Sequence, residues 1–456
     1  METRSIASRH IDLRRIALNL LIRINEEQAF SHLLIREALA KLTDGRDKAL
    51  VKRLTEGTLE YQIRLDYIIN QFAKIPVDKM KPLIRNLLRL SAYQILFMDK
   101  IPDRSACDEA VKLAEKSGFS ALKGFTNGIL RNLSRAKDNL ALPSETDTPI
   151  DYLSIYYSVP AWLVKKWRGE YSYQQTKSIC AGLLEIRPIT VRLNGKNTAG
   201  QVKAWLENLE TLGVEAKRHP YLDYAYQLSG IEDIKDLPGF KAGFFSIQDV
   251  SSMLVCEAAK IRKEDLVIDV CAAPGGKALH ASEKAKKVIA HDISENKLKY
   301  IRENAARLKQ DNLEISVYDA GSLDESLIDK ADVLLADLPC SGLGVIARKP
   351  DIKHRLTEAA ISELCDLQRR ILGVVWQYVK PGGTLIYSTC TINLDENEKM
   401  MAWFTANFPF SYDALPENLE NIISLNQNEP LKGMLKLLPG IHLTDGFFIC
   451  RLRRDD

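Results

Sequence analysis

The stretch LVIDVCAAPGGK, residues 266–277, decides the fold of the larger part of this 456-residue chain. Its apolar first half is typical of a strand covered on both faces, and its paired glycines lead into a helical segment. Five more segments have the composition of strands: 287–293, 313–320, 331–339, 383–391 and 446–452. An amphipathic segment at 357–378 predicts a long helix, and Pro381-Gly382-Gly383 predicts a turn after it. Strands that alternate with helices predict an α/β domain over residues 239–456, with a mainly parallel sheet.

The first third of the chain is predicted to be all helical. Apolar residues repeat there at intervals of three and four, as the buried stripe of a helix requires. The clearest run is Leu13, Ile16, Ala17, Leu20, Leu21 and Ile24. Pro76, Pro82 and Pro102 lie between or at the starts of the helical segments, where proline is tolerated. We expect an all-α bundle over residues 1–140 and a polar linker at 136–150.

Charge is distributed unevenly along the chain. Residues 1–140 carry 25 Lys and Arg against 17 Asp and Glu, whereas the remaining 316 residues carry 38 against 43. The formal net charge of the whole chain is +3 at pH 7. A basic module is typical of proteins that bind a polyanion, because Lys and Arg near phosphates release condensed counterions. A solvated helical surface is the alternative interpretation of the same excess.

Between the bundle and the α/β domain, residues 151–238 predict a small α+β module. The segment 188–194 alternates like a strand, 201–213 has helical spacing and ends at a glycine, and 225–230 resembles a second strand. Seven aromatic residues precede these elements: Tyr152, Tyr156, Tyr157, Trp162, Trp167, Tyr171 and Tyr173. Aromatic rings beside basic residues can stack on bases, but we expect most of these rings to fill a small core.

Composition narrows the class of protein. No stretch approaches the roughly 18 uninterrupted apolar residues of a membrane helix, and the N-terminal METRSIASRHIDLRR lacks the apolar region of a secretory signal. The eight cysteines form no CxxC pair and are too dilute for a disulfide framework. We therefore expect a cytoplasmic protein that acts as a monomer, without a membrane partner or a metal, in which a functional cysteine would act as a thiol.

The carboxyl ends of the predicted strands carry residues suited to a nucleoside. Cys271-Ala272-Ala273-Pro274-Gly275-Gly276-Lys277 follows the first strand, and its glycines allow backbone N–H groups to approach a ligand. Asp292 ends the second strand, where a carboxylate can accept both hydroxyls of a ribose. Asp319 and Asp337 end the third and fourth strands. Because the loop matches neither G-x-G-x-x-G nor a Walker motif, we expect an adenosine-containing ligand other than a dinucleotide or a nucleoside triphosphate.

Two of the eight cysteines differ from the rest in their position. Cys340 follows the fourth strand, in DLPC, and Cys390 follows the fifth, in YSTC. They would therefore close adjacent strands on the side where a ligand binds. Free cysteines are commonly buried in cores. We expect that position for Cys107, Cys180, Cys256, Cys365 and Cys450.

A thiol beside an adenosine site fits methylation at C5 of a pyrimidine. That carbon is too weak a nucleophile to take a methyl group from S-adenosylmethionine unaided. A thiolate that adds to C6 makes an enamine whose C5 then attacks, and a base later removes the C5 proton so that the thiol leaves. Asp337 is placed to act as the acid at cytosine N3, and Lys277 is a candidate cation that favours ionisation of the thiol. These residues by themselves leave open which cysteine attacks.

Four ordered motifs resemble those of the RNA cytosine-5 methyltransferases of the Sun/Nop2 group. They are DVCAAPGGK (269–277), DLPCSGLGVIARKPDIK (337–353), YSTCTINLDENE (387–398) and DGFF (445–448). The resemblance implies a Rossmann-like methyltransferase domain in which the loop 271–277 and the three strand-end aspartates line the site for S-adenosylmethionine. It also implies that Cys390 is the nucleophile and that Cys340 helps to release the product. Two positions depart from the family pattern: His354, where relatives often carry tryptophan, and Thr391, where serine is common.

The N-terminal region resembles the antitermination factor NusB, an RNA-binding helical fold. The segments that carry this resemblance are RRIALNLLIRI (14–24), EGTLEYQIRLDYIIN (56–70), DEAVKLAEKSG (108–118) and FTNGILRNL (125–133). Both resemblances together imply a bacterial enzyme that methylates small-subunit (16S) ribosomal RNA at an unpaired or flipped-out cytosine, because C6 is inaccessible within a base stack. The alternatives are the same chemistry on transfer RNA, or less readily on DNA, and an RNA-binding protein whose methyltransferase domain is only a scaffold.

Overall fold

The computed structural model describes residues 12–231, 233–423 and 432–456. The chain divides into two compact units, of which the first contains residues 1–184 with 348–355 and the second contains 185–347 with 356–456. Residues 9–11, which the sequence places at the start of the helical region, lie outside the described residues. Within the described ranges, none of the helices combines the length and the apolar character that a membrane span requires.

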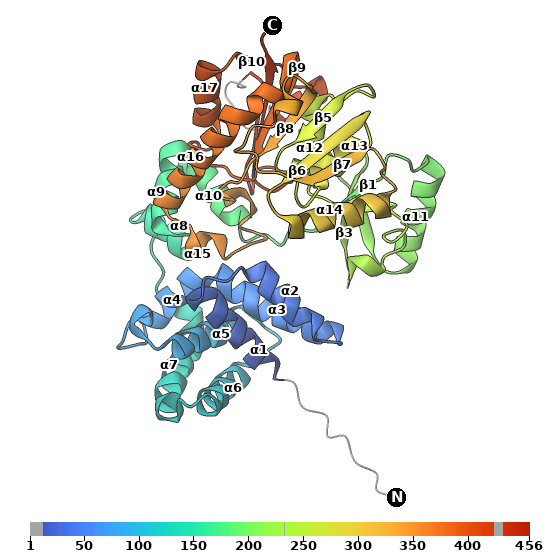
Figure 1. Cartoon of the computed structure of the whole chain (residues 1–456). Coiled ribbons are helices and arrows are strands. Elements are labelled where there is room, and N and C mark those ends of the chain that lie inside the picture. The colour runs from blue at the N-terminus through green and yellow to red at the C-terminus, as the bar shows by residue number, and fades with distance from the viewer. Residues whose placement is uncertain (1–11, 232, 424–431) are drawn as a thin grey trace, which may run out of the picture. The chain divides into compact units, whose positions relative to one another are not determined.

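The first unit is all helical (Figure 1). Its helices are α1 (Leu13–Glu26), α2 (Ser31–Ala40), α3 (Gly45–Glu60), α4 (Gln62–Asn70), α5 (Pro82–Phe97), α6 (Asp103–Lys116), α7 (Lys123–Ala136), α8 (Pro149–Tyr156), α9 (Ala161–Glu170), α10 (Tyr173–Gly182) and α15 (Ile352–Arg355). The predicted apolar stripe lies on α1, where Ala17, Leu20, Leu21 and Ile24 are buried. Pro82 is the first residue of α5. The predicted helical bundle is confirmed.

One helix of the first unit comes from a distant part of the sequence. α15 follows the DLPC motif in sequence, yet its side chains bond to the end of α3. Lys353 Nζ donates to the carbonyl oxygen of Glu60 at 2.7 Å, and a ring nitrogen of His354 lies 2.8 Å from the carbonyl oxygen of Leu59. The last carbonyls of a helix have no partner within it, so α15 supplies partners that α3 cannot.

The predicted aromatic region also lies in the first unit. Trp167 is completely buried, and the rings of Tyr152 and Tyr156 stack with centroids 5.1 Å apart. Tyr157 packs edge-on against Tyr156. Of the seven aromatic residues only Trp167 is buried, so the expectation that most of these rings fill a core is wrong.

The second unit contains a small antiparallel sheet with strand order β2-β3-β1-β4. Its elements are β1 (Ile189–Leu193), α11 (Ala199–Thr211), β2 (Glu215–Arg218), β3 (Ala225–Ser229) and β4 (Phe245–Ile247). Val191, Trp205, Tyr226 and Phe245 share its core. An α+β module is therefore confirmed as a small sheet with one helix packed on it. Its strands span 189–247, whereas residues 151–184 of the predicted module belong to the first unit.

The second unit also contains a large sheet with order β10-β12-β9-β8-β5-β6-β7, and β11 pairs with β12. Its elements are α12 (Val250–Ala259), β5 (Leu266–Asp269), α13 (Gly276–Ser282), β6 (Lys287–Asp292), α14 (Glu295–Leu308), β7 (Leu313–Val317), β8 (Ala331–Asp337), α16 (Glu358–Val375), β9 (Val379–Thr389), α17 (Glu398–Asn407), β10 (Phe410–Tyr412), α18 (Glu417–Ile423), β11 (Met434–Leu437) and β12 (Phe447–Arg454). The five strands from β9 to β7 are parallel, and β12 runs antiparallel to β9. The predicted mainly parallel sheet is confirmed.

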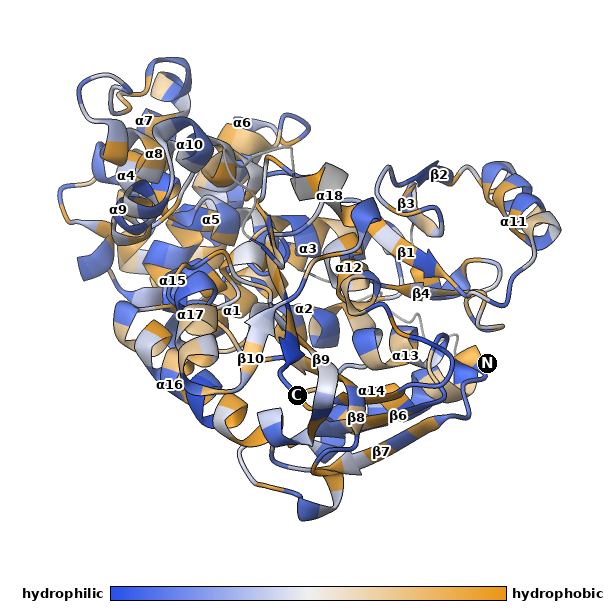
Figure 2. Cartoon of the chain, turned by 90° about the horizontal axis from the view of Figure 1, so that it is seen from above, coloured by the Kyte–Doolittle hydropathy of each residue, from blue (hydrophilic) through white to orange (hydrophobic). Residues whose placement is uncertain are grey.

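The order of these strands places a ligand crevice at one edge. From β5 the chain adds β6 and β7 on one side and then β8 and β9 on the other, so its direction of growth reverses between β5 and β8. Ligands of such sheets bind outside the carboxyl ends of the strands at this reversal. Figure 1 shows α16 and α17 on one side of the sheet and α13 and α14 on the other. Figure 2 shows hydrophilic and hydrophobic residues mixed along α16, as a helix with one buried face requires.

The turn predicted at Pro381-Gly382-Gly383 is wrong. These residues lie within β9, where Val379 is opposite Ala331 but Thr384 is already opposite Val333. The extra residues of β9 form a bulge, which Gly382 permits by adopting a φ of +69°. Proline and glycine therefore mark an irregularity inside the strand instead of its beginning.

Candidate active site

The loop that follows β5 has a backbone that requires glycine. Gly275 has a φ of +106°, and a Cβ at this position would lie 3.0 Å from the side chain of Ile301. Gly276 then begins α13. The backbone N–H of Ala273 donates to Asp292 Oδ2 at 3.1 Å, which fixes the loop to the end of β6. The sequence LVIDVCAAPGGK thus forms a strand, a tight loop and a helix at the reversal point of the sheet.

The three predicted aspartates lie at one edge of the sheet. Asp292 and Asp337 are the last residues of β6 and β8, and Asp319 comes two residues after β7. Asp292 is buried, and its other oxygen accepts from the backbone N–H of Ser294 at 3.0 Å. Asp319 is exposed and accepts from the N–H of Gly321 at 2.9 Å. Backbone donors thus hold the carboxylates of Asp292 and Asp319 in a defined orientation.

Lys277 and Asp337 form an ion pair at the reversal point. Lys277 Nζ lies 2.6 Å from Asp337 Oδ2, and Ser388 Oγ donates to Asp337 Oδ1 at 2.8 Å. Burial acts to lower the pKa of Lys277, but Asp337 outweighs it, with a contribution from Cys390, and the pKa lies above its ordinary value. The lysine is therefore a permanent cation close to a thiol.

The two cysteines predicted to close adjacent strands lie in contact. Their Sγ atoms are 3.3 Å apart, after the ends of β8 and β9. The hydrogen bond to Cys390, followed by burial, raises the pKa of Cys340 well above its ordinary value. Cys340 consequently keeps its proton and can donate it to the sulfur of Cys390. The other cysteines expected in cores are all buried, as predicted: Cys107, Cys180, Cys256, Cys365 and Cys450.

A buried glutamate that the sequence analysis missed joins the two cysteine loops. Glu396 is fully buried and accepts from the backbone N–H of Ser341 at 2.8 Å and from Asn393 Nδ2 at 2.9 Å. Gln368 of α16 donates to it at 3.2 Å. Ser341 follows Cys340 directly, so Glu396 positions that loop. Its only sequence signal is its place in YSTCTINLDENE.

The sequence analysis also missed a second acid, which lies close to the ion pair of Lys277 and Asp337. Asp269 is the last residue of β5 and is buried, and burial followed by the charge of Asp337 raises its pKa to about 7. An acidic residue at the end of the apolar run LVID was the available signal. Among the described residues, no group of three or more His, Cys, Asp or Glu side chains is placed to hold a metal ion.

The parallel sheet reverses its strand order at a glycine loop, and acids and paired thiols follow its strand ends. This combination is that of a Rossmann-like methyltransferase. Family models agree with this class. The model described as 16S rRNA methyltransferase RsmB/F matches residues 257–453, the NusB family matches 12–135, and a ferredoxin-like domain of RsmF/B-like methyltransferases matches 159–235.

Relatives match over almost the full length. A probable ribosomal RNA small subunit methyltransferase B from Bacillus subtilis is 36% identical, covering 97% of this chain and 98% of the relative. A ribosomal RNA small subunit methyltransferase B from Klebsiella pneumoniae is 31% identical, with 97% and 98% covered. The crystal structure of PH0851 has the same fold, with a TM-score of 0.79 and 24% identity over 97% of this chain and 99% of that one. The chain belongs to the RsmB/F family of RNA methyltransferases.

Proposed function

We propose that this chain transfers a methyl group from S-adenosylmethionine to C5 of a cytosine in small-subunit ribosomal RNA, through a temporary bond between Cys390 and C6. The observation that carries the proposal is the contact of two thiols, 3.3 Å apart, at strand ends beside a charged lysine. The names of the relatives support the substrate, because both act on small-subunit ribosomal RNA.

The residues at the strand ends fit S-adenosylmethionine, which supplies an electrophilic methyl group when bound. Both oxygens of Asp292 accept backbone N–H groups and keep further lone pairs for the hydroxyls of a ribose. The loop 271–277 lets a ligand approach its backbone at Gly275 and Gly276. Asp319, exposed after β7, is the candidate partner of the adenine edge.

The thiol pair and the ion pair divide the work of the first step. Cys390 reacts as the thiolate, stabilised by the S–H of Cys340 and the charge of Lys277. As its sulfur bonds to C6, the electron pair of the C5–C6 double bond moves through the ring toward N3. Asp337 is a carboxylate while it is paired with Lys277, so it takes up a proton before this step and then delivers it to N3. C5 then has the electron density to take the methyl group.

Release reverses the addition. A base removes the C5 proton and the N3 proton returns to Asp337. The C5–C6 double bond forms again, and the C6–S bond breaks so that Cys390 leaves as a thiolate. Cys340, in contact with the leaving sulfur, assists this elimination. Glu396 keeps the Cys340 loop in place through the backbone of Ser341.

A covalent trap tests the two cysteine roles. The full chain is incubated with ribosomal RNA and S-adenosylmethionine and analysed on a denaturing gel. We expect Cys340→Ala to accumulate a protein–RNA adduct, Cys390→Ala to form none and to lose methyl transfer, and Cys107→Ala, a buried thiol of the first unit, to behave as wild type. An adduct in Cys390→Ala but not in Cys340→Ala would reverse the two roles.

Mapping of 5-methylcytosine tests the substrate. Mass spectrometry of small-subunit ribosomal RNA from cells that lack this chain should show one cytosine without its methyl group. The purified chain should restore that methyl group. Loss of 5-methylcytosine from transfer RNA, with the ribosomal RNA unchanged, would assign the chemistry to the other substrate.

A further inference from the structure

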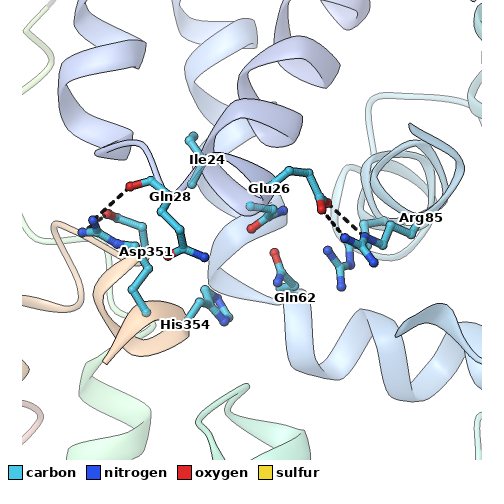
Figure 3. Close-up of a pocket in the computed structure, with 10 residues that line it drawn as sticks. Ile24, Glu26, Gln28, Gln62, Arg85, Asp351 and His354 are labelled. Atoms are coloured by element: carbon cyan, nitrogen blue, oxygen red, sulfur yellow. Dashed lines mark hydrogen bonds and ion pairs between the residues drawn. The ribbon is translucent and has the colours of Figure 1, made fainter. Parts of the chain in front are cut away.

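A polar pocket lies in the first unit, bordered by the C-terminal end of α1, the start of α4, α5 and α15 (Figure 3). Its volume is about 140 Å³, close to the roughly 150 Å³ of an engineered cavity that holds one benzene ring. Almost all of its lining is polar or charged. A six-membered polar ring, alone or as the inward-facing ring of a purine, therefore fits its size and its character.

The charged groups of the pocket are mostly paired with one another. Arg85 bonds to Glu26, and Arg355 Nη2 donates to Asp351 at 2.7 Å. Arg89, almost fully buried, donates to Asp66 outside the lining. The lining thus holds three guanidinium groups and two carboxylates.

Two polar atoms of the lining have no such partner. Gln62 Oε1 and Arg355 Nε are buried, and neither has a hydrogen-bond partner among the described residues. Figure 3 shows Gln62 between the Glu26–Arg85 pair and His354. An unpaired buried acceptor and an unpaired buried donor each cost stability, and a ligand that donates to one and accepts from the other would satisfy both.

The chemistry of the lining selects a base over a phosphate. A phosphate offers only acceptors to the protein, so it would leave the buried Gln62 Oε1 without a donor. The Watson–Crick edge of adenine or cytosine instead carries an amino donor next to a ring-nitrogen acceptor. Guanidinium planes such as those of Arg85 and Arg89 also stack on bases.

We infer that this pocket binds the base of one unpaired adenine or cytosine of the RNA, distinct from the cytosine that is methylated. Its amino group donates to Gln62 Oε1, the unpaired buried acceptor of the lining. The inference rests on the proposed function, which supplies an RNA as the partner.

Dimethyl sulfate probing of 16S ribosomal RNA tests this pocket, because the reagent methylates N1 of adenine and N3 of cytosine where these are free. We expect the wild-type chain to protect at least one unpaired adenine or cytosine, and Gln62→Met to lose that protection with a roughly tenfold weaker RNA affinity. The melting temperature of Gln62→Met should not fall, since the substitution removes an unpaired buried oxygen. Gln71→Met, at the other end of α4 and outside the pocket, is the matched control.

Arg355→Lys provides a second variant, because it keeps the charge but removes the Nε donor and the planar group. The same nucleotide should become reactive in both variants. The same reactivity pattern for wild type and Gln62→Met would overturn the inference, whether or not methylation occurs. If the wild-type chain leaves every cytosine of the ribosomal RNA unmethylated, the proposed function fails instead, and the two results are read on separate gels.

Discussion

The strand-end cluster of the second unit and the polar pocket of the first differ in how their polar groups are partnered. In the cluster, Lys277 is bonded to Asp337 and the two thiols are bonded to each other. In the pocket, Gln62 and Arg355 each keep a buried atom without a partner among the described residues. The ion pair and the thiol pair are satisfied within the cluster, whereas these two atoms of the pocket lining have hydrogen-bonding capacity to offer.

This difference separates chemistry from recognition. Groups that must hold a charge or a proton at the moment of reaction benefit from partners that fix them beforehand. Groups that must select a ligand benefit from capacity that only the ligand satisfies. The contrast is testable by removing partners in each unit and measuring activity and stability separately.

The largest effect is expected for Lys277→Met. The substitution leaves Asp337 without its cation and removes the charge beside Cys390, so methyl transfer should fall roughly 100-fold. The affinity for S-adenosylmethionine should fall much less. Steady-state methyl incorporation and ligand titration measure the two quantities. Lys287→Met breaks an exposed pair with Glu314 and should leave both unchanged. Equal loss in the two variants would show that Lys277 has no special role.

The next effect concerns Asp269 and the pH dependence of the second unit. Its pKa is raised to about 7 by burial, so between about pH 4 and 7 the folded state binds the proton more tightly than the unfolded state does. The stability of the unit should therefore fall as pH rises through this range, by up to about 1.4 kcal/mol per pH unit. Asp269→Asn should remove this slope, measured as hydrogen exchange of β5 corrected for the intrinsic rate. If stability depended on pH in the same way in Asp269→Asn as in the wild type, Asp269 would not be the group that titrates.

The architecture could be predicted from the sequence, because each helix and strand is indicated by the spacing of apolar residues within its own segment. The apolar run 266–270 and the stripe on α1 each bury residues with the period of their element, and the structure confirms both. The bulge in β9 was not predicted, because Pro381 and Gly382 favour a turn. In the structure they lie within the strand, between Val379 and Thr384, which both pair with β8. Local preference was overridden there by the sheet.

The candidate site shows the same limit. The loop glycines, strand-end acids and thiols are short motifs at strand ends, so their residues could be named in advance. Glu396 could not, because its role depends on Ser341, 55 positions away in sequence. The pocket of the first unit could not be predicted either, because α15 contacts α3 although nearly 300 residues separate them in sequence.

An effect of similar size and opposite sign is expected in the first unit. Burial lowers the pKa of Lys353 to about 7, against a weaker opposing influence of Glu60. Between about pH 7 and 10 the unfolded state binds the proton and the folded state does not, so stability should rise with pH. Lys353→Met should flatten that rise in hydrogen exchange of α3 and leave β5 unaffected. A fall of stability over this range in the wild type would refute the sign.

The smallest effect should be the same in both units. Ser172 caps α10 in the first unit and Thr198 caps α11 in the second, and each forms a capping box with the glutamine three residues later. Ser172→Ala or Thr198→Ala removes one acceptor from a helix N-terminus and should cost about 1 kcal/mol of local stability. Neither position lies in the cluster or the pocket, so methyl transfer and dimethyl sulfate protection should match wild type. Because a cap acts only on its own helix, a loss of RNA protection in Ser172→Ala would show that recognition depends on the helices around the pocket as well as on its lining.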